Sequence, residues 1–162
     1  MPTQLTGSIK GYTLLIQFLQ VLDVGSGSGY LTACLAKMAS GEEARVYGVD
    51  HVPELVEWAT SNVTADSPEL LNSRLSFIVG DGRLGLPEQA PFDVIHVGAA
   101  APELPPALVD QLAVGGRLVI PIGTRWGDQY LEVVNKVTKA EVVRNRAMPV
   151  KFVPLTDRDR QV

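Results

Sequence analysis

A glycine-rich turn between an apolar run and a helix-like segment constrains the fold of this chain more than any other feature. The run Val21–Val24 is followed by glycines at positions 25, 27 and 29, and then by mostly apolar residues. This order predicts a buried strand, a tight loop and a helix at roughly 28–39, which together open a nucleotide-binding α/β unit. Glycines at alternate positions let the main chain turn sharply and leave room for a ligand against bare backbone.

The residues around this turn favour one kind of ligand. A dinucleotide-binding loop would have its third glycine at position 30, where this sequence has Tyr30. Asp23, at the end of the predicted strand, would repel a pyrophosphate and favour a ligand with positive charge. S-adenosylmethionine has such charges on its ammonium and sulfonium groups, so we expect Asp23 and the loop residues Gly25, Ser26 and Gly27 to bind it. A glycine-rich turn that binds nothing is the alternative.

Composition sets the limits of the chain. Its 162 residues, 46% of them hydrophobic, suit one domain with a core. The net charge of −4 gives no indication of nucleic acid as a partner. Cys34 is the single cysteine and cannot form an internal disulfide, so we expect a cytoplasmic protein. The apolar run from Tyr12 to Val24 is too short and too polar to span a membrane, and two histidines without a cysteine pair predict no metal site.

The rest of the chain alternates between strand-like and helix-like segments. Strands are expected at 45–51, 75–79, 92–97 and 117–121, helices from Pro53 and over 102–112, and a hairpin over 129–138 and 141–153. This alternation predicts an α/β, Rossmann-like fold, a mostly parallel sheet with helices on both faces. For Tyr30, Trp58 and Trp126, which have apolar neighbours, we expect packing in the core or at its rim.

Three aspartates follow predicted strands, and parallel strands bring their carboxyl ends to one edge of a sheet. Besides Asp23 these are Asp50, 25 positions after Gly25, and Asp81. A carboxylate at Asp50 could accept both hydroxyls of a ribose, or it could cap the helix that begins at Pro53. Asp81 could accept a hydrogen bond from an adenine amino group while Gly82 lets the ring approach, or it could be a plain turn residue. His96, at the end of the fourth strand, is a structural histidine or a substrate contact.

Several longer stretches of the sequence are typical of one enzyme family. They are Val-Leu-Asp-Val-Gly-Ser-Gly-Ser-Gly-Tyr-Leu-Thr-Ala-Cys from Val21, Gly-Val-Asp-His at 48–51, Val-Gly-Asp-Gly-Arg at 79–83, Ala-Pro-Phe-Asp-Val-Ile-His-Val-Gly-Ala-Ala-Ala-Pro at 90–102, and the segments 115–123 and 153–161. In these stretches the chain resembles the protein-L-isoaspartate (D-aspartate) O-methyltransferases, and the eukaryotic members most.

The resemblance implies a class I S-adenosylmethionine-dependent methyltransferase domain over residues 21–162. It implies an enzyme that methylates the free carboxylate of isoaspartyl residues in damaged proteins as a step of their repair. The cofactor contacts that it implies are Ser28, Asp50, His51, Asp81, Gly82, Thr156 and Gln161. The acceptor side would include His96, Val97 and Gly98, where small residues up to Ala101 leave main-chain groups for a peptide backbone lying close. We expect a monomer, and we expect no membrane or nucleic-acid partner.

Residues 1–20 depart from the family's pattern. Members of the family have a long helical region before the glycine loop, with a Ser-Ala-Pro-His-type segment that closes over the cofactor and contains the active-site serine. Here Ser8 is followed by Ile9-Lys10-Gly11. We therefore assign no catalytic residue and expect residues 1–20 to be a divergent or truncated segment. The expected consequence is low stability and weak turnover, so the alternative function is a catalytically impaired, cofactor-binding isoform or remnant of the enzyme.

Overall fold

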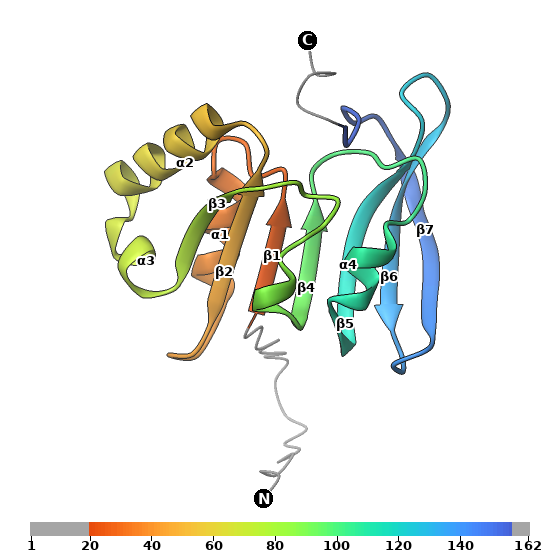
Figure 1. The fold of residues 1–162 in the computed structure, drawn as a ribbon, viewed down its shortest axis with the longest axis horizontal. Coiled ribbons are helices and arrows are strands. Elements are labelled where there is room, and N and C mark those ends of the chain that lie inside the picture. The colour runs from red at the N-terminus through yellow and green to blue at the C-terminus, as the bar shows by residue number, and fades with distance from the viewer. Residues whose placement is uncertain (1–19, 157–162) are drawn as a thin grey trace, which may run out of the picture.

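The computed structural model describes residues 20–156, which form one seven-stranded sheet flanked by helices (Figure 1). Along the chain the first half contains β1 (Gln20–Val24), α1 (Tyr30–Met38), β2 (Arg45–Asp50), α2 (Pro53–Asp66), α3 (Pro68–Ser73) and β3 (Leu75–Val79). The second half contains the 3-10 helix η1 (Pro87–Gln89), β4 (Phe92–Val97), α4 (Pro106–Asp110), β5 (Leu112–Gly123), β6 (Gln129–Lys136) and β7 (Val142–Val150). The predicted Rossmann-like α/β class is confirmed.

The order of the strands creates a switch point in the middle of the sheet. The order is β3-β2-β1-β4-β5-β6-β7, with the first five strands in the chain parallel and β6 and β7 antiparallel to their neighbours. The chain therefore builds outward from β1 to β3 and then returns to place β4 on the other side of β1. Ligands of open α/β sheets bind at the carboxyl ends of the strands beside such a point.

Alternating side chains on the strands build a core on each face of the sheet. On β1, Val21 packs in one core with Ala36 of α1, Val63 of α2 and Leu70 of α3. The next residue, Leu22, belongs to the second core, where α4 packs over β5, as Figure 1 also shows. This period of two is that of a strand with both faces covered.

The structure differs from the sequence-based prediction in the region of α4 and β5. The helix expected over 102–112 is only α4, because Pro105 and Pro106 exclude the preceding residues from helical conformation and fix the start at Pro106. The strand expected at 117–121 is longer, because β5 begins at Leu112 and includes Gly115 and Gly116. A Cβ on Gly116 would lie 3.0 Å from the carbonyl oxygens of Phe92 and Asp93, so glycine lets β5 pass close to β4.

Two further features of the described residues bear on the predictions. The segment 68–73 forms the short helix α3, which is not among the helices that the sequence predicted. No helix within residues 20–156 is long and apolar enough to cross a membrane.

Candidate functional site

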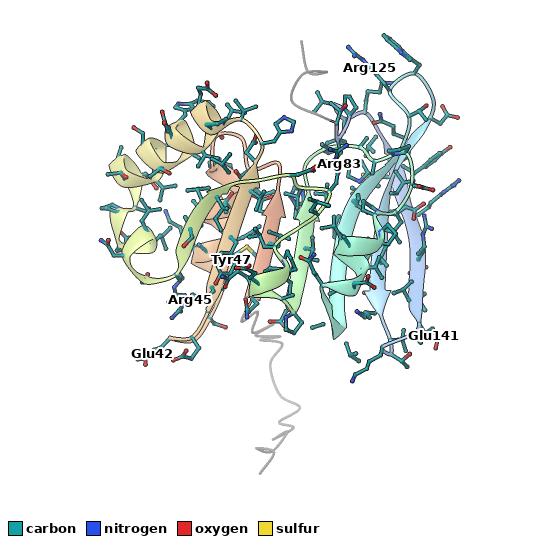
Figure 2. All side chains as sticks on the ribbon, in the orientation of Figure 1. Glu42, Arg45, Tyr47, Arg83, Arg125 and Glu141 are labelled. Carbon is teal, nitrogen blue, oxygen red and sulfur yellow. The ribbon has the colours of Figure 1, made fainter. Side chains whose placement is uncertain are left out.

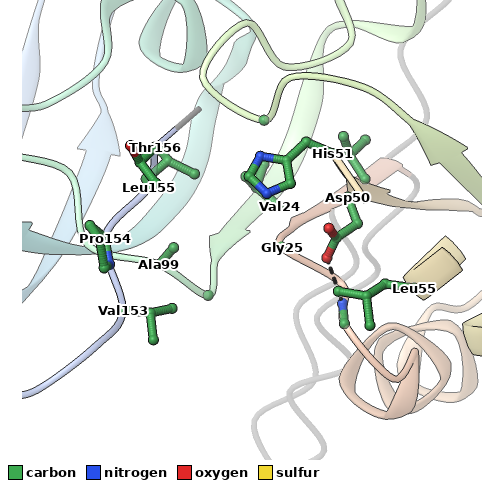
Figure 3. Close-up of a pocket in the computed structure, with 14 residues that line it drawn as sticks. Val24, Gly25, Asp50, His51, Leu55, Ala99, Val153, Pro154, Leu155 and Thr156 are labelled. Carbon is green, nitrogen blue, oxygen red and sulfur yellow. Dashed lines mark hydrogen bonds between the residues drawn. The ribbon is translucent and has the colours of Figure 1, made fainter. Parts of the chain in front are cut away.

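A cavity of about 210 Å³ lies at the carboxyl ends of the parallel strands, beside the switch point (Figure 3). Its volume is below the range of about 300–1,000 Å³ that is typical of ligand sites, so a nucleoside-sized ligand would extend past its rim. The lining residues come from β1, β2, the loops after β1, β2, β3 and β4, the start of α2, and the last described residues. They are Val24, Gly25, Gly27, Val49, Asp50, His51, Leu55, Gly82, Gly98, Ala99, Val153, Pro154, Leu155 and Thr156.

The glycine loop forms one wall of this cavity with its main chain. Gly25, Gly27 and Gly29 have φ values of 78°, 52° and 79°, which lie in the left-handed region that favours glycine. The N–H of Gly25 donates to the carbonyl of Val49 at 2.8 Å and so ties the loop to β2. A Cβ on Gly29 would lie 2.7 Å from the ring of Phe77, so no side chain fits there without a shift.

Asp50 holds the loop and reaches the rim of the cavity. Its Oδ2 accepts a hydrogen bond from the Gly27 N–H at 3.1 Å, drawn as the dashed line in Figure 3, and its Oδ1 accepts one from the Val52 N–H at 3.1 Å. The residue that precedes α2 is Val52, and no side chain caps this helix, so Asp50 is not its cap. The carboxylate keeps lone pairs that can accept further hydrogen bonds from a ligand.

Of the two residues predicted after the third strand, Gly82 lines the cavity and Asp81 does not. The Arg83 guanidinium binds Asp81 with both Nε and Nη2, the latter at 2.7 Å from Oδ2. These hydrogen bonds from the Arg83 side chain lower the pKa of the Asp81 carboxyl below its ordinary value. Gly82 lines the cavity, and a Cβ there would lie 2.3 Å from Cγ1 of Val24, so the absence of a side chain leaves this wall flat.

The segment 151–156, which we call the strap, forms the wall opposite the loop. Figure 3 shows residues 153–156 of the strap facing His51 and Asp50 across the cavity. The strap pairs with the segment after β4: the Ala100 N–H donates to Val153 O at 2.7 Å, and the Leu155 N–H donates to Ala100 O at 2.8 Å. Apart from Thr156, which the resemblance implied, no sequence signal identified the strap as part of the site. A coil segment carries no periodicity that would place it.

These hydrogen bonds also correct the expectation that main-chain groups after β4 are open to a peptide. The N–H and C=O of Ala100 are bonded to the strap, and those of Ala101 are bonded to Pro121 O and the Gly123 N–H of β5. Both alanines are buried. The stretch is small because the chain's own segments pack against it.

The structure places Asp23 away from the cavity, contrary to the direct contact that we expected. The side chain lies between α1 and β4. Its Oδ2 accepts a hydrogen bond from Thr32 Oγ1 of α1 at 2.6 Å, and its Oδ1 lies 2.7 Å from Nδ1 of His96 of β4. Asp23 is 1% exposed. The three residues join β1, α1 and β4 directly beneath the loop, and His96 is thereby a structural partner of Asp23 and does not line the cavity.

The other predicted residues are distributed around the site. Gly25, Gly27, His51, Gly98 and Thr156 line the cavity, whereas Val97 is buried in the core. Ser26 is buried, and its hydroxyl has no hydrogen-bond partner among the described residues. Ser28 lies in a groove between α1 and α2, where its carbonyl accepts from Asn62. Gln161 lies outside the described residues.

The expected packing of three aromatic residues is wrong for two of them and incomplete for the third. Tyr30 is 76% exposed and Trp126 is 88% exposed, and Trp58 is half-exposed. Tyr30 begins α1 and lines the outer groove between α1 and α2. The guanidinium of Arg125 lies 5.1 Å from the Trp126 ring.

A second cavity, of about 290 Å³, lies on the other side of the strap. It shares Pro154, Leu155 and Thr156 with the first cavity and is completed by Arg83, Ala100, Pro102, Gly123, Thr124 and Arg125. Figure 2 shows Arg83 and Arg125 at the same edge of the sheet, opposite to Glu42 and Glu141. The strap is therefore a wall common to two neighbouring cavities.

Comparison with known proteins assigns the chain to a family. The family model described as protein-L-isoaspartate(D-aspartate) O-methyltransferase (PCMT) matches residues 3–160, nearly the whole chain. The chain belongs to this family. It is 53% identical over 146 residues to protein-L-isoaspartate O-methyltransferase 1 of Arabidopsis thaliana and 52% identical over 156 residues to the Triticum aestivum enzyme.

The same family is found among solved structures. A PCMT from Plasmodium falciparum in complex with S-adenosyl-L-homocysteine superposes with a TM-score of 0.77 at 36% identity, covering 88% of this chain and 68% of that one. The alignments cover 89% and 92% of this chain but only 62% and 66% of the Arabidopsis and wheat proteins. The chain thus spans about two thirds or less of the length of these curated relatives.

Proposed function

We propose that the chain has the activity after which its family is named, the transfer of a methyl group from S-adenosylmethionine to the free carboxylate of isoaspartyl residues in damaged proteins. The observation that carries the proposal is the family match to residues 3–160, a range that contains all 14 residues lining the first cavity. Identity of about half to two plant enzymes of this name supports the same reaction.

The first cavity fits the cofactor by the chemistry of its walls. Asp50 would accept hydrogen bonds from the ribose hydroxyls, which are stronger to a charged acceptor than to a neutral one. The bare main chain at Gly25 and Gly27 lets a ligand approach closely, and Gly82 leaves a flat wall suited to an adenine ring. His51 and Thr156 would complete the polar contacts. When bound, S-adenosylmethionine supplies an electrophilic methyl group on its sulfonium.

The acceptor requires alignment more than activation. An ionised carboxylate attacks a methyl group without a general base, so the site's task is to orient the two groups and exclude water. We place the acceptor polypeptide in the second cavity, where Thr124 and Arg125 offer hydrogen-bond donors to a chain rich in carbonyl and carboxylate oxygens. Gly98, one of the three expected acceptor-side residues, would lie beside the cofactor. His96 and Val97 do not line the cavity and would only support its wall.

The decisive assay uses two peptides that differ only in one linkage. We expect the chain to transfer a radiolabelled methyl group to a peptide with an isoaspartyl residue and to leave the normal aspartyl peptide unlabelled. Equal labelling of both peptides would contradict the proposed acceptor. Calorimetry with S-adenosylhomocysteine and with NAD supplies the second arm, in which binding of NAD alone would contradict the proposed cofactor.

The same assays separate this function from the alternative of a cofactor-binding chain without turnover. That alternative rests on residues 1–20, of which 1–19 lie outside the described part of the chain. Binding of S-adenosylhomocysteine without methylation of the isoaspartyl peptide would favour it. We further propose a cytoplasmic protein, because the single cysteine, Cys34, is a free thiol, and cell fractionation tests this. The proposed monomer is tested by sedimentation.

A further inference from the structure

The strap is the part of the site with the least support from regular structure. β7 ends at Val150, which pairs with Gln129 of β6, and the chain then leaves the sheet. Four residues of the strap nevertheless line the first cavity, and three of these also line the second. What holds the strap in place therefore determines the shape of both cavities.

The side chain of Gln129 supplies that support where the sheet ends. Its Oε1 accepts a hydrogen bond from the Phe152 N–H at 2.6 Å, and its Nε2 donates to the Phe152 carbonyl at 3.2 Å. The carboxamide thus offers the main chain of Phe152 one acceptor and one donor, as a neighbouring strand would. Gln129 is 2% exposed, so water does not compete for these bonds.

The same carboxamide also fixes the turn between β5 and β6. Its second N–H donates to the Thr124 carbonyl at 3.2 Å. Gly123 and Gln129 form the last pair of β5 and β6, so Gln129 stands where three segments diverge: the end of β5, the end of β7 and the strap. Thr124 and Arg125 of this turn line the second cavity, although Gln129 itself lines neither cavity.

We propose that Gln129 is a positioning residue for both ligands of the methyltransferase site, acting through the strap on the cofactor and through the strap and the β5–β6 turn on the acceptor. The acceptor part rests on the proposed function. Removing the buried amide leaves main-chain groups of Phe152 and Thr124 without hydrogen-bond partners, and these groups then move to reach water. Loss of Gln129 therefore displaces the strap, the wall that the two cavities share.

The chain offers a matched control in Gln111. Gln111 is 7% exposed and clamps a loop in the same manner, with Oε1 accepting from the Leu86 N–H at 2.8 Å and Nε2 donating to Leu84 O at 2.7 Å. It lines neither cavity. Gln111→Met and Gln129→Met each replace a buried amide by an unbranched apolar side chain of similar size and remove one loop clamp.

The experiment compares these two variants with the parent chain by urea unfolding, by calorimetry with S-adenosylhomocysteine and by steady-state kinetics with an isoaspartyl peptide. We expect both variants to lose stability to a similar degree. Gln129→Met should raise the dissociation constant for S-adenosylhomocysteine and the KM for the peptide about tenfold each, whereas Gln111→Met should change both less than twofold. Gln129→Glu, which keeps the acceptor for Phe152 but sets a buried carboxylate against the carbonyl oxygens of Phe152 and Thr124, should raise both at least as much as Gln129→Met.

The outcomes separate this inference from the function on which part of it rests. A parent chain that binds S-adenosylhomocysteine but methylates no isoaspartyl peptide contradicts the proposed activity, and the calorimetric comparison still tests Gln129. Unchanged affinity in Gln129→Met, or equal loss of affinity in Gln111→Met, overturns the positioning role. If Gln129→Met does not fold, Gln129→Leu, which also removes the amide without burying a charge, decides by the same comparison.

Discussion

The two halves of the sheet contribute to the site by different means. The helical half, β1–β3 with α1–α3, contributes strand ends and a loop whose conformation is set by glycines and by the carboxylate of Asp50. The antiparallel half, β5–β7, contributes a strap that has left the sheet and is held by the side chain of Gln129. One wall is therefore fixed by backbone conformation that the residue types dictate, and the other by contacts with distant segments, the buried amide of Gln129 and the main chain of Ala100.

The largest expected effect tests the wall that glycine conformation fixes. Gly29→Ala should destabilise the chain by about 2–5 kcal/mol, because alanine is strained in the left-handed region and its Cβ would lie 2.7 Å from Phe77 and 2.9 Å from Ala59. Gly27→Ala, at φ 52° with nothing within 4 Å of its Cβ, should cost only about 1–2 kcal/mol. Urea unfolding measures both, and equal losses would show that packing beneath the loop does not matter.

The next effect concerns the ligand and Asp50. Asp50→Ala should weaken binding of S-adenosylhomocysteine by about 1.5–3 kcal/mol, the usual contribution of hydrogen bonds to a charged group. Asp50→Asn, which keeps an acceptor, should lose less. Calorimetry provides the measurement, with Asp66→Ala on the exposed end of α2 as the control for loss of an acidic residue. Unchanged affinity in both Asp50 variants would limit this residue to holding Gly27.

Asp23 distinguishes support from binding within the helical half. Asp23→Asn should lower the free energy of unfolding by about 1–3 kcal/mol, because the buried carboxylate is bonded to Thr32 and His96. The affinity for S-adenosylhomocysteine should change less than twofold. A variant of normal stability with weakened binding would restore the direct cofactor contact that the sequence suggested.

The smallest effect is the pH dependence of the pair Asp81 and Arg83. Arg83 lowers the pKa of Asp81 in the folded chain, so the pair stabilises the fold above the unfolded pKa of about 3.9 and this contribution is lost as the pH falls through the lower folded value. The side chains of Arg83 and Asp81 are 41% and 34% exposed, and this exposure limits the contribution of the pair to less than about 1 kcal/mol. Urea midpoints from about pH 5 to about pH 3 should fall less steeply in Arg83→Gln than in the parent, and parallel curves would contradict the assignment.

The contrast between the two halves also explains what could be predicted from the sequence. The strand at 75–79, the strand at 92–97 and the start of α2 at Pro53 are as expected, since apolar runs and proline fix them locally. Asp50 and Gly82 could be placed at the site because a strand end in a parallel sheet has one position relative to its neighbours.

The remaining features depend on contacts between distant segments. Asp23 and His96 are 73 positions apart, and only the register of β1 with β4 brings them together, so sequence spacing could not distinguish a buried pair from a ligand contact. The strap is fixed by Gln129, 23 positions earlier, and by main-chain bonds to Ala100. Main-chain bonds of this kind leave no pattern in the sequence.

Hydrogen exchange with and without S-adenosylhomocysteine tests most directly whether the two walls form one cofactor site. We expect the ligand to slow exchange both in peptides covering residues 25–29 and 50–55 and in peptides covering the strap, residues 151–156. Protection confined to the loop and the end of β2, with the strap exchanging as in the free chain, would contradict this expectation.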